Sequence, residues 1–113
     1  MRVVKDGDLI FLSHINSIYN MKVDEVLRIN KSLLELEDVR TKSYGIREYY
    51  MITDGFIKRS WNKIRFYNYD KAEFSLNIKD KRVDELEKFR NSYISIEVRE
   101  TSLLRYFTWT FLS

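Results

Sequence analysis

The chain has 113 residues, a length typical of one domain, and its 20 Lys and Arg against 17 Asp and Glu give a formal net charge of +3 at pH 7. It has no Cys, no Pro and only three Gly, which excludes disulfides and thiolate metal sites and argues against linkers. No apolar run approaches the about 18 residues of a membrane span, and charges begin at Arg2. We therefore expect residues 1–113 to form a single domain that is cytoplasmic and does not enter a membrane.

The composition is skewed, and so is the distribution of charge. The chain is rich in Ile, Lys, Asn, Tyr and Phe, a usage typical of AT-rich coding, so we expect its source to be a low-GC bacterium, a phage or an archaeal virus. Residues 40–71 hold eight Lys and Arg against three Asp and Glu, whereas residues 23–39 hold two against five. An anionic partner is therefore expected to contact the basic middle of the chain.

The first third of the chain predicts one strand and one ambiguous segment. Residues 8–12 form an apolar run typical of a buried strand. Residues 23–37 carry a stripe at helical spacing, made of Val23, Val26, Leu27, Asn30, Leu33 and Leu34. This spacing favours a helix, but alternation at residues 27–29 and 34–37 also fits a hairpin that turns through residues 30–31, and both interpretations stay open.

The middle of the chain predicts a hairpin and a basic, aromatic strand. Residues 46–53 have the composition of a strand, and Asp54 with Gly55 forms the strongest short hairpin signal. Pairing across this turn makes odd-numbered positions apolar, whereas the strand over 61–69 has its apolar residues at even positions. A bulge or break near residues 59–62 is therefore expected to reconcile the two registers.

The last third predicts strands on both sides of a helix. Alternation over residues 72–78 and 93–99 is typical of half-buried strands. Between them, Asp80 is the expected N-cap of a helix over about 82–91, with Val83, Leu86 and Phe89 on its buried stripe. A polar turn near 100–102 leads to a last strand over 103–112, whose edge is a candidate surface for a homodimer.

These elements predict an α+β fold: a small, mostly antiparallel sheet or partly open barrel, with one helix over about 82–91 and a second over about 23–37. Strands, a helix and two further strands are also the order of a small OB-type barrel, which binds oligonucleotides on the face of its second and third strands. In this interpretation residues 46–70 form that face, where the basic and aromatic residues gather.

The residues that usually perform catalysis are sparse. His14 is the single histidine and is expected to be a surface or loop residue, and Asp6 with Asp8 is more typical of a turn than of a cation site. Glu97 and Arg99 imitate part of a nuclease motif, but no upstream acid accompanies them. We therefore predict a protein that is not an enzyme and uses no cofactor and no metal.

Binding is the function that the sequence favours. On a strand over 61–69, odd positions share one face, and its cations and aromatic rings suit the phosphates and bases of a nucleic-acid strand or a nucleotide. The predicted site comprises Lys58, Arg59, Trp61, Lys63, Arg65, Tyr67 and Tyr69. Ile64 and Phe66 alternate with this face and are expected in the core.

The alternative function is that of a small phage or mobile-element protein, an inhibitor or adaptor of the counter-defence or immunity type, that acts by binding a protein. Its motivation is the small size, the lack of catalytic groups and the abundance of Tyr, Trp and Arg, which dominate interface hot spots. A basic face suits an acidic protein surface or a nucleoprotein as the target.

Overall fold

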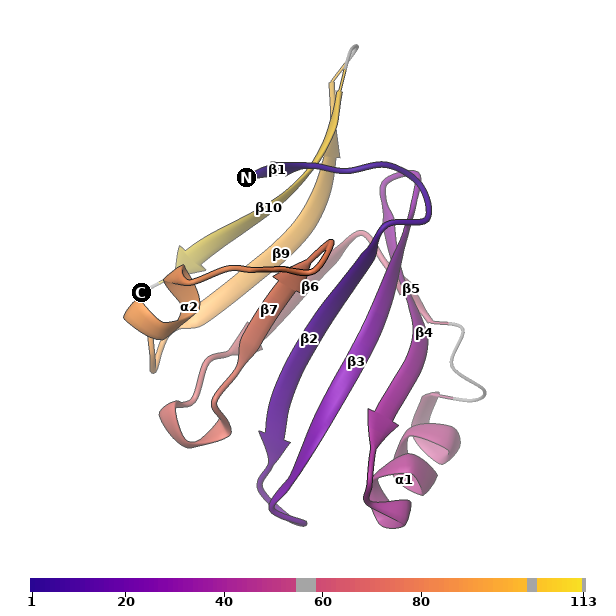
Figure 1. The fold of residues 1–113 in the computed structure, drawn as a ribbon, viewed down its shortest axis with the longest axis vertical. Helices are drawn as coiled ribbons and strands as arrows, with labels where there is room; N and C mark the ends of the chain where they lie inside the picture. The colour runs from indigo at the N-terminus through magenta and orange to yellow at the C-terminus, as the bar shows by residue number, and fades with distance from the viewer. Residues whose placement is uncertain (55–58, 102–103, 113) are drawn as a thin grey trace.

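The computed structural model describes residues 1–54, 59–101 and 104–112, whose strands form two antiparallel sheets that face one another (Figure 1). The described elements in chain order are β1 (Arg2–Val3), β2 (Leu9–Asn16), β3 (Met21–Asn30), β4 (Leu33–Thr41), α1 (Tyr44–Asp54), β5 (Ser60–Trp61), β6 (Lys63–Tyr67), the 3₁₀ turn η1 (Asp70–Ala72), β7 (Ser75–Ile78), β8 (Lys81–Arg82), α2 (Glu85–Lys88), β9 (Tyr93–Glu100) and β10 (Arg105–Leu112). The four-stranded sheet has the order β1-β10-β9-β6, and the six-stranded sheet has the order β5-β4-β3-β2-β7-β8. The predicted α+β fold with mostly antiparallel strands is confirmed, and the described strands do not close into a barrel.

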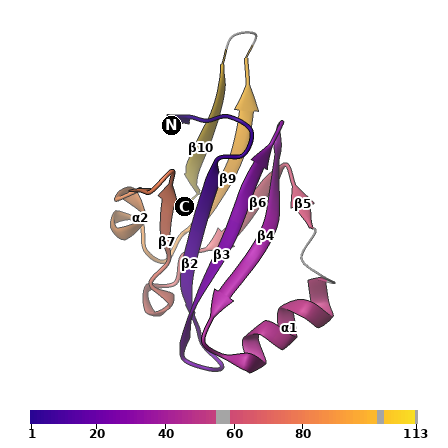
Figure 2. The same cartoon turned by 45° about the vertical axis from the view of Figure 1, so that its right-hand side comes forward.

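The two sheets pack against each other (Figure 2), and the buried apolar side chains of the described residues form one core cluster to which both sheets contribute. Ile10 and Leu34 of the six-stranded sheet are fully buried, and so are Ile94, Ile96 and Phe107 of the four-stranded sheet. Burying a side chain of this size stabilises the fold by about 1.5–3 kcal/mol relative to leaving it exposed. Ile94, Ile96 and Val98 of β9 are buried, and Phe107, Trp109 and Phe111 of β10 lie in or against the core, so both predicted strands are confirmed with bounds of 93–100 and 105–112.

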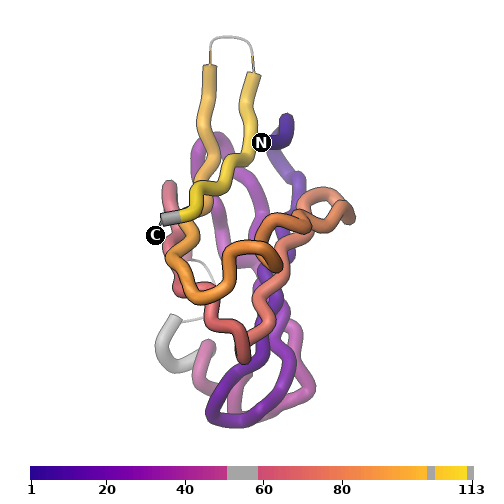
Figure 3. Tube along the Cα trace, turned by 90° about the vertical axis from the view of Figure 1, so that its left-hand side faces the viewer, coloured from indigo at the N-terminus to yellow at the C-terminus, as the bar shows by residue number. Residues whose placement is uncertain are grey.

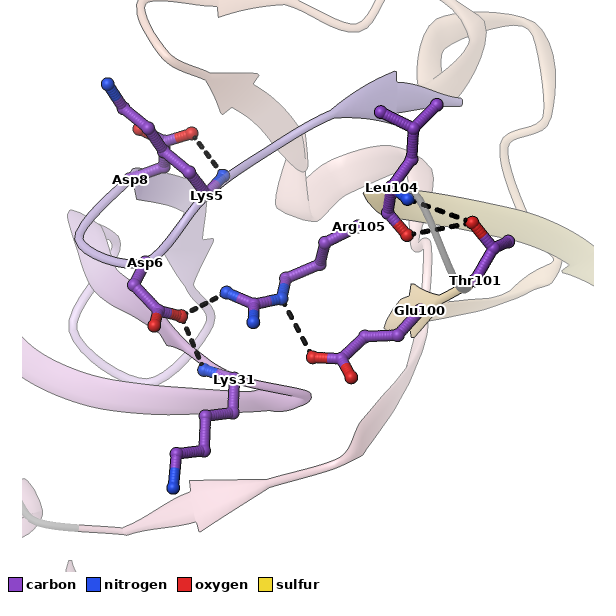
Figure 4. A network of polar contacts seen from close by, with 8 residues as sticks. All are labelled: Lys5, Asp6, Asp8, Lys31, Glu100, Thr101, Leu104 and Arg105. Atoms are coloured by element: carbon purple, nitrogen blue, oxygen red, sulfur yellow. Dashed lines mark hydrogen bonds and ion pairs between the residues drawn. The ribbon is translucent and has the colours of Figure 1, made fainter.

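A polar network ties together three turns at one end of the molecule (Figure 4). Asp6, in the turn between β1 and β2, accepts a hydrogen bond from the backbone N–H of Lys31 at 2.7 Å and pairs with Arg105. The Nε of Arg105 donates to Glu100 at 2.9 Å, and Asp8 Oδ2 accepts from the backbone N–H of Lys5. Asp6 and Asp8 therefore lie in a turn, as the sequence predicts, and their carboxylates hold neighbouring segments.

Residues 23–37 form most of a hairpin, so the favoured helix interpretation is wrong and the alternative is right. β3 and β4 pair from Val23 with Thr41 to Asn30 with Leu33, so the turn lies one residue later than predicted. The register shifts in the middle, because Val26 pairs with Asp38 and Leu27 with Leu36, which leaves one extra residue in β4. Both Val26 and Leu27 are buried although neighbours in a strand point to opposite faces, and this imitates a helical stripe.

Residues 46–53, predicted as a strand, lie within the helix α1. The helix begins after Ser43, whose Oγ accepts a hydrogen bond from the backbone N–H of Ile46 at 3.2 Å, the geometry of an N-cap. Ile46 and Tyr50, one helical turn apart, pack against the core. Asp54 is the last residue of α1, so it does not open the predicted hairpin, and Gly55 lies outside the described residues. The OB-type face expected over 46–70 is therefore also wrong.

The predicted helix over 82–91 shortens to the single turn of α2, Glu85–Lys88. Asp80 is not its N-cap: Lys79 and Asp80 have φ of 52° and 66° and form the two-residue turn between β7 and β8. Val83 and Leu86 are buried as predicted, whereas Phe89 is 44% exposed and stacks on Phe111 at 4.1 Å between ring centroids.

The remaining predicted strands are observed. β2 extends the strand expected over 8–12, and β7 covers only Ser75–Ile78 of the segment 72–78, because Ala72 ends η1. β9 and β10 form a long hairpin that extends past the other strands at one end of the molecule (Figure 3). β10 pairs with β1 only at Tyr106 and Phe107, so among the described residues no strand covers the edge of β10 from Thr108 onward.

Candidate functional site

The predicted binding strand divides between the two sheets at Asn62. β5 pairs with β4 in the six-stranded sheet, and β6 pairs with β9 in the four-stranded sheet. The break near 59–62 that the sequence predicts is therefore confirmed. Within β6 the alternation also holds, because Lys63 and Arg65 are exposed whereas Ile64 and Phe66 pack against the core.

Trp61 does not lie on the outer face of β6 with the other predicted residues. It sits in β5 opposite Leu34, is half-buried and packs against the core. The change of sheet at Asn62 explains this placement, since the alternation of a strand does not continue across the break. Lys58 lies outside the described residues, and Arg59 is exposed just before β5.

Tyr67 and Tyr69 meet a third tyrosine that the sequence analysis missed. Tyr93 pairs with Tyr67 in the register of β6 and β9, and their rings stack with centroids 4.9 Å apart and planes 29° apart. Tyr69 packs edge-on against Tyr67, with centroids 4.5 Å apart. Tyr69 is 60% exposed and Tyr93 is 48% exposed, so the cluster presents aromatic surface to solvent. Tyr93 was detectable only as the first residue of an alternating strand.

Arg65 completes this cluster with a cation on an aromatic ring. Its guanidinium carbon lies 4.6 Å from the centroid of Tyr93, within the range of cation–π attraction. Ser95, the residue opposite Arg65 in the register, is small enough for the long side chain to cross toward Tyr93, and it is buried. We call Lys63, Arg65, Tyr67, Tyr69 and Tyr93 the tyrosine–arginine face.

The two cations of the tyrosine–arginine face are available to an anion. Among the residues that the structure describes, neither Lys63 nor Arg65 forms an ion pair. The acid nearest in register, Glu97, lies opposite Lys63 but accepts two hydrogen bonds from Arg99, at 2.8 and 3.1 Å. This face therefore combines exposed positive charge with exposed aromatic rings.

A pocket of about 340 Å³ opens between the two sheets beside this face. Its lining includes apolar, aromatic and basic side chains: Leu27, Leu36, Ile64, Tyr50, Trp61, Arg59, Lys63 and Arg65, together with Glu25. The Tyr50 hydroxyl donates a hydrogen bond to the Glu25 carboxylate within it. The structure thus brings the predicted residues together as two adjoining sets, with Lys63 and Arg65 common to the pocket and to the tyrosine–arginine face.

Asn68 holds the segment that carries Tyr67 and Tyr69. Its side chain is fully buried, and Nδ2 donates to the carbonyl oxygens of Leu86 at 2.8 Å and Phe89 at 3.1 Å. Its Oδ1 accepts from Arg90 at 2.8 Å. Asn68 therefore satisfies carbonyls at the end of α2 and anchors the tyrosine segment to the fold.

His14 differs from the surface or loop residue that the sequence predicts. It lies within β2, is half-buried and stacks on Phe74 with ring centroids 4.9 Å apart. Burial lowers the pKa of His14 below its ordinary value of 6.5, and the charge of Asp24 acts in the opposite direction. Its Nδ1 is buried without a hydrogen-bond partner in the described part of the chain.

The described residues contain no group of three or more His, Cys, Asp or Glu that could hold a metal ion. None of the described helices is long and apolar enough to cross a membrane. No family model, no curated protein and no solved structure matches this chain.

Proposed function

We propose that this protein binds single-stranded nucleic acid on the tyrosine–arginine face, without catalysing a reaction. The observation that supports it best is the stack of Arg65 on Tyr93, next to Tyr67 and Tyr69, on the outer side of a sheet. Aromatic rings and guanidinium planes stack on unpaired bases of any sequence, and cations neutralise the phosphates between them.

The arrangement suits a single strand better than a duplex. Bases of a duplex are stacked on each other, so their faces do not reach a sheet, whereas bases of a single strand can be splayed onto aromatic side chains. Each stacked base contributes about 1–3 kcal/mol, which corresponds to about 5- to 150-fold in affinity. Loss of one ring is therefore expected to be measurable even when binding is weak.

Fluorescence anisotropy of a labelled single-stranded oligonucleotide of about ten nucleotides tests this proposal. We expect Tyr93→Ala to weaken binding about 5-fold or more, and Arg65→Ala to weaken it and to reduce the salt dependence by about one phosphate contact. Arg40→Ala is the matched control, because Arg40 is exposed and lies over the ring of Phe11 at 5.4 Å on the other sheet.

Two outcomes of this experiment would count against the proposal. Binding that is unchanged in Tyr93→Ala and reduced equally by Arg65→Ala and Arg40→Ala would mean nonspecific attraction to net positive charge, and it would refute the proposed face. If no binding is detected at low salt with tens of micromolar protein, the proposed function is refuted altogether, because this concentration lies within the range of dissociation constants typical of nonspecific binding.

A protein partner is the second candidate function, and the position of β6 favours it. β6 is the edge strand of the four-stranded sheet, so among the described residues its outer edge carries no neighbouring strand. An extended segment of a partner can add to such an edge by backbone hydrogen bonds. A stoichiometric protein captured equally with and without nuclease treatment would favour this candidate over nucleic acid.

A further inference from the structure

We infer that the pocket between the two sheets binds one nucleotide that carries a terminal phosphate. This inference rests on the proposed function, since it assigns to the same strand, β6, a second subsite with a defined ligand. The ligand chemistry is that of a nucleoside monophosphate, which is either free or the phosphorylated end of a bound strand.

The size and composition of the pocket support a single base. Its volume of about 340 Å³ lies at the small end of the range typical of small-molecule sites. Leu27, Leu36 and Ile64 supply apolar lining, and the half-buried indole of Trp61 supplies an aromatic surface against which a base can stack. The position of Trp61 therefore suits base stacking inside the pocket, and not on the outer face of the strand, where the sequence predicted it.

The positive charge at the pocket suits the phosphate group of the inferred ligand. Arg59, Lys63 and Arg65 all line it, and each is exposed on the solvent side, so a phosphate can meet several cations without being buried. Hydrogen bonds between cations and phosphate oxygens are stronger than those between neutral groups. The Tyr50–Glu25 pair adds polar atoms that the edge of a base can contact.

The pocket is continuous with the tyrosine–arginine face. Lys63 and Arg65 border both, and Tyr67 follows them on the same strand. A nucleic-acid strand whose bases lie on Tyr93 and Tyr69 therefore runs along β6 toward Trp61, where the end of the nucleic acid can enter between the sheets. A pocket at this position is suited to bind the end of a nucleic-acid strand rather than its interior.

Nuclear magnetic resonance of the unmodified protein tests this inference with an internal control. The chain has two tryptophans, so the indole N–H region of a ¹H–¹⁵N spectrum contains one signal from Trp61 and one from Trp109, assigned with Trp61→Phe. We expect adenosine 5′-monophosphate to shift the Trp61 signal and to leave that of Trp109, which does not line the pocket, unchanged. Adenosine and inorganic phosphate should each bind at least about tenfold more weakly than adenosine 5′-monophosphate.

Lys63→Ala should lower the affinity for the monophosphate by up to about tenfold. Lys22→Ala, which removes an exposed cation of the other sheet, should leave this affinity unchanged. An oligonucleotide with a 5′-phosphate that shifts Trp61 where the 5′-hydroxyl form does not would identify the strand end as the source. If the monophosphate shifts Trp61 and neither oligonucleotide does, the free nucleotide is the ligand. Equal shifts of Trp61 by the 5′-phosphate and 5′-hydroxyl forms would show that the terminal phosphate is not recognised and would overturn the inference.

Failure of this inference differs from failure of the proposed function. If millimolar monophosphate leaves the Trp61 signal unmoved while the oligonucleotide still binds in a Tyr93-dependent manner, the pocket assignment is overturned and the face remains. If monophosphate shifts Trp61 but no oligonucleotide binds, the proposed function fails and the pocket remains a nucleotide site.

Discussion

Removal of the Asn68 side chain should destabilise the protein more than any change at the surface. The residue is fully buried, and its amide makes three hydrogen bonds, two as donor to Leu86 and Phe89 and one as acceptor from Arg90. A typical hydrogen bond contributes about 1 kcal/mol net, and an unsatisfied buried partner costs about as much again or more. We therefore expect Asn68→Ala to lower the free energy of unfolding by roughly 3 kcal/mol.

The size of this effect is large against the total. Domains of this length are stable by about 5–15 kcal/mol, so the variant should fold but melt roughly 10 °C lower. Asn68→Asp should not restore stability, because a carboxylate accepts from Arg90 but cannot donate to the two carbonyls. Because Asn68 lies between Tyr67 and Tyr69, the same variants should also weaken oligonucleotide binding.

Urea unfolding followed by circular dichroism measures this prediction, with Asn30→Ala as the control because Asn30 is exposed at the end of β3. The control should change the free energy of unfolding by less than about 0.5 kcal/mol. A loss below about 1 kcal/mol in Asn68→Ala, with an unchanged slope against urea, would show that the three bonds are not needed and would contradict the reasoning.

Three further predictions concern other parts of the fold. Because burial lowers the pKa of His14 in the folded state, the unfolded chain gains its proton first as the pH falls, so stability should decrease as the pH drops from about 6.5 toward the folded pKa; His14→Gln should flatten this part of a profile of urea midpoint against pH. A Cβ on Gly45 would lie 2.8 Å from the Tyr19 ring, so Gly45→Ala should raise the free energy of unfolding, by up to about 1 kcal/mol, only in a Tyr19→Ala background, and equal effects in both backgrounds would exclude the contact. If the uncovered edge of β10 mediates a homodimer, light scattering should give twice the monomer mass, and Thr110→Lys should restore the monomer.

The sequence predicted β9 and β10 from their alternation, because Ile94, Ile96 and Val98 of β9 and Phe107, Trp109 and Phe111 of β10 lie in or against the core at every second position. β2 was predictable from its short apolar run, although Ser13 is buried beside Leu12, so its burial does not alternate throughout. The break near 59–62 is present where the sequence predicts it, but the prediction was based on a hairpin of 46–53 that the structure replaces with α1, so the observed change of sheet has a different cause. The hairpin of β3 and β4 was not predictable, because its bulge and the burial of both Val26 and Leu27 reproduce the spacing of a helix.

In α1, a strand-like composition hid a signal that was present in the sequence. Tyr, Ile and Thr favour strands on average, but Ser43 stands at the N-cap and Ile46 and Tyr50 recur at the spacing of one helical turn. Burial of this pair against β4 decides the outcome, because tertiary packing outweighs a propensity that spans about 1 kcal/mol.

For the candidate site, the sequence by itself determined that Lys63 and Arg65 point to solvent on one face of a strand, because the apolar Ile64 and Phe66 between them must face the core. Only the tertiary structure decided what lies beside them. Tyr93 reaches Tyr67 through the pairing of β9 with β6, and Trp61 leaves the face because the chain changes sheets at Asn62. Both depend on which distant strands become neighbours, and that choice is made by the packing of the whole core rather than by the residues of the strand itself.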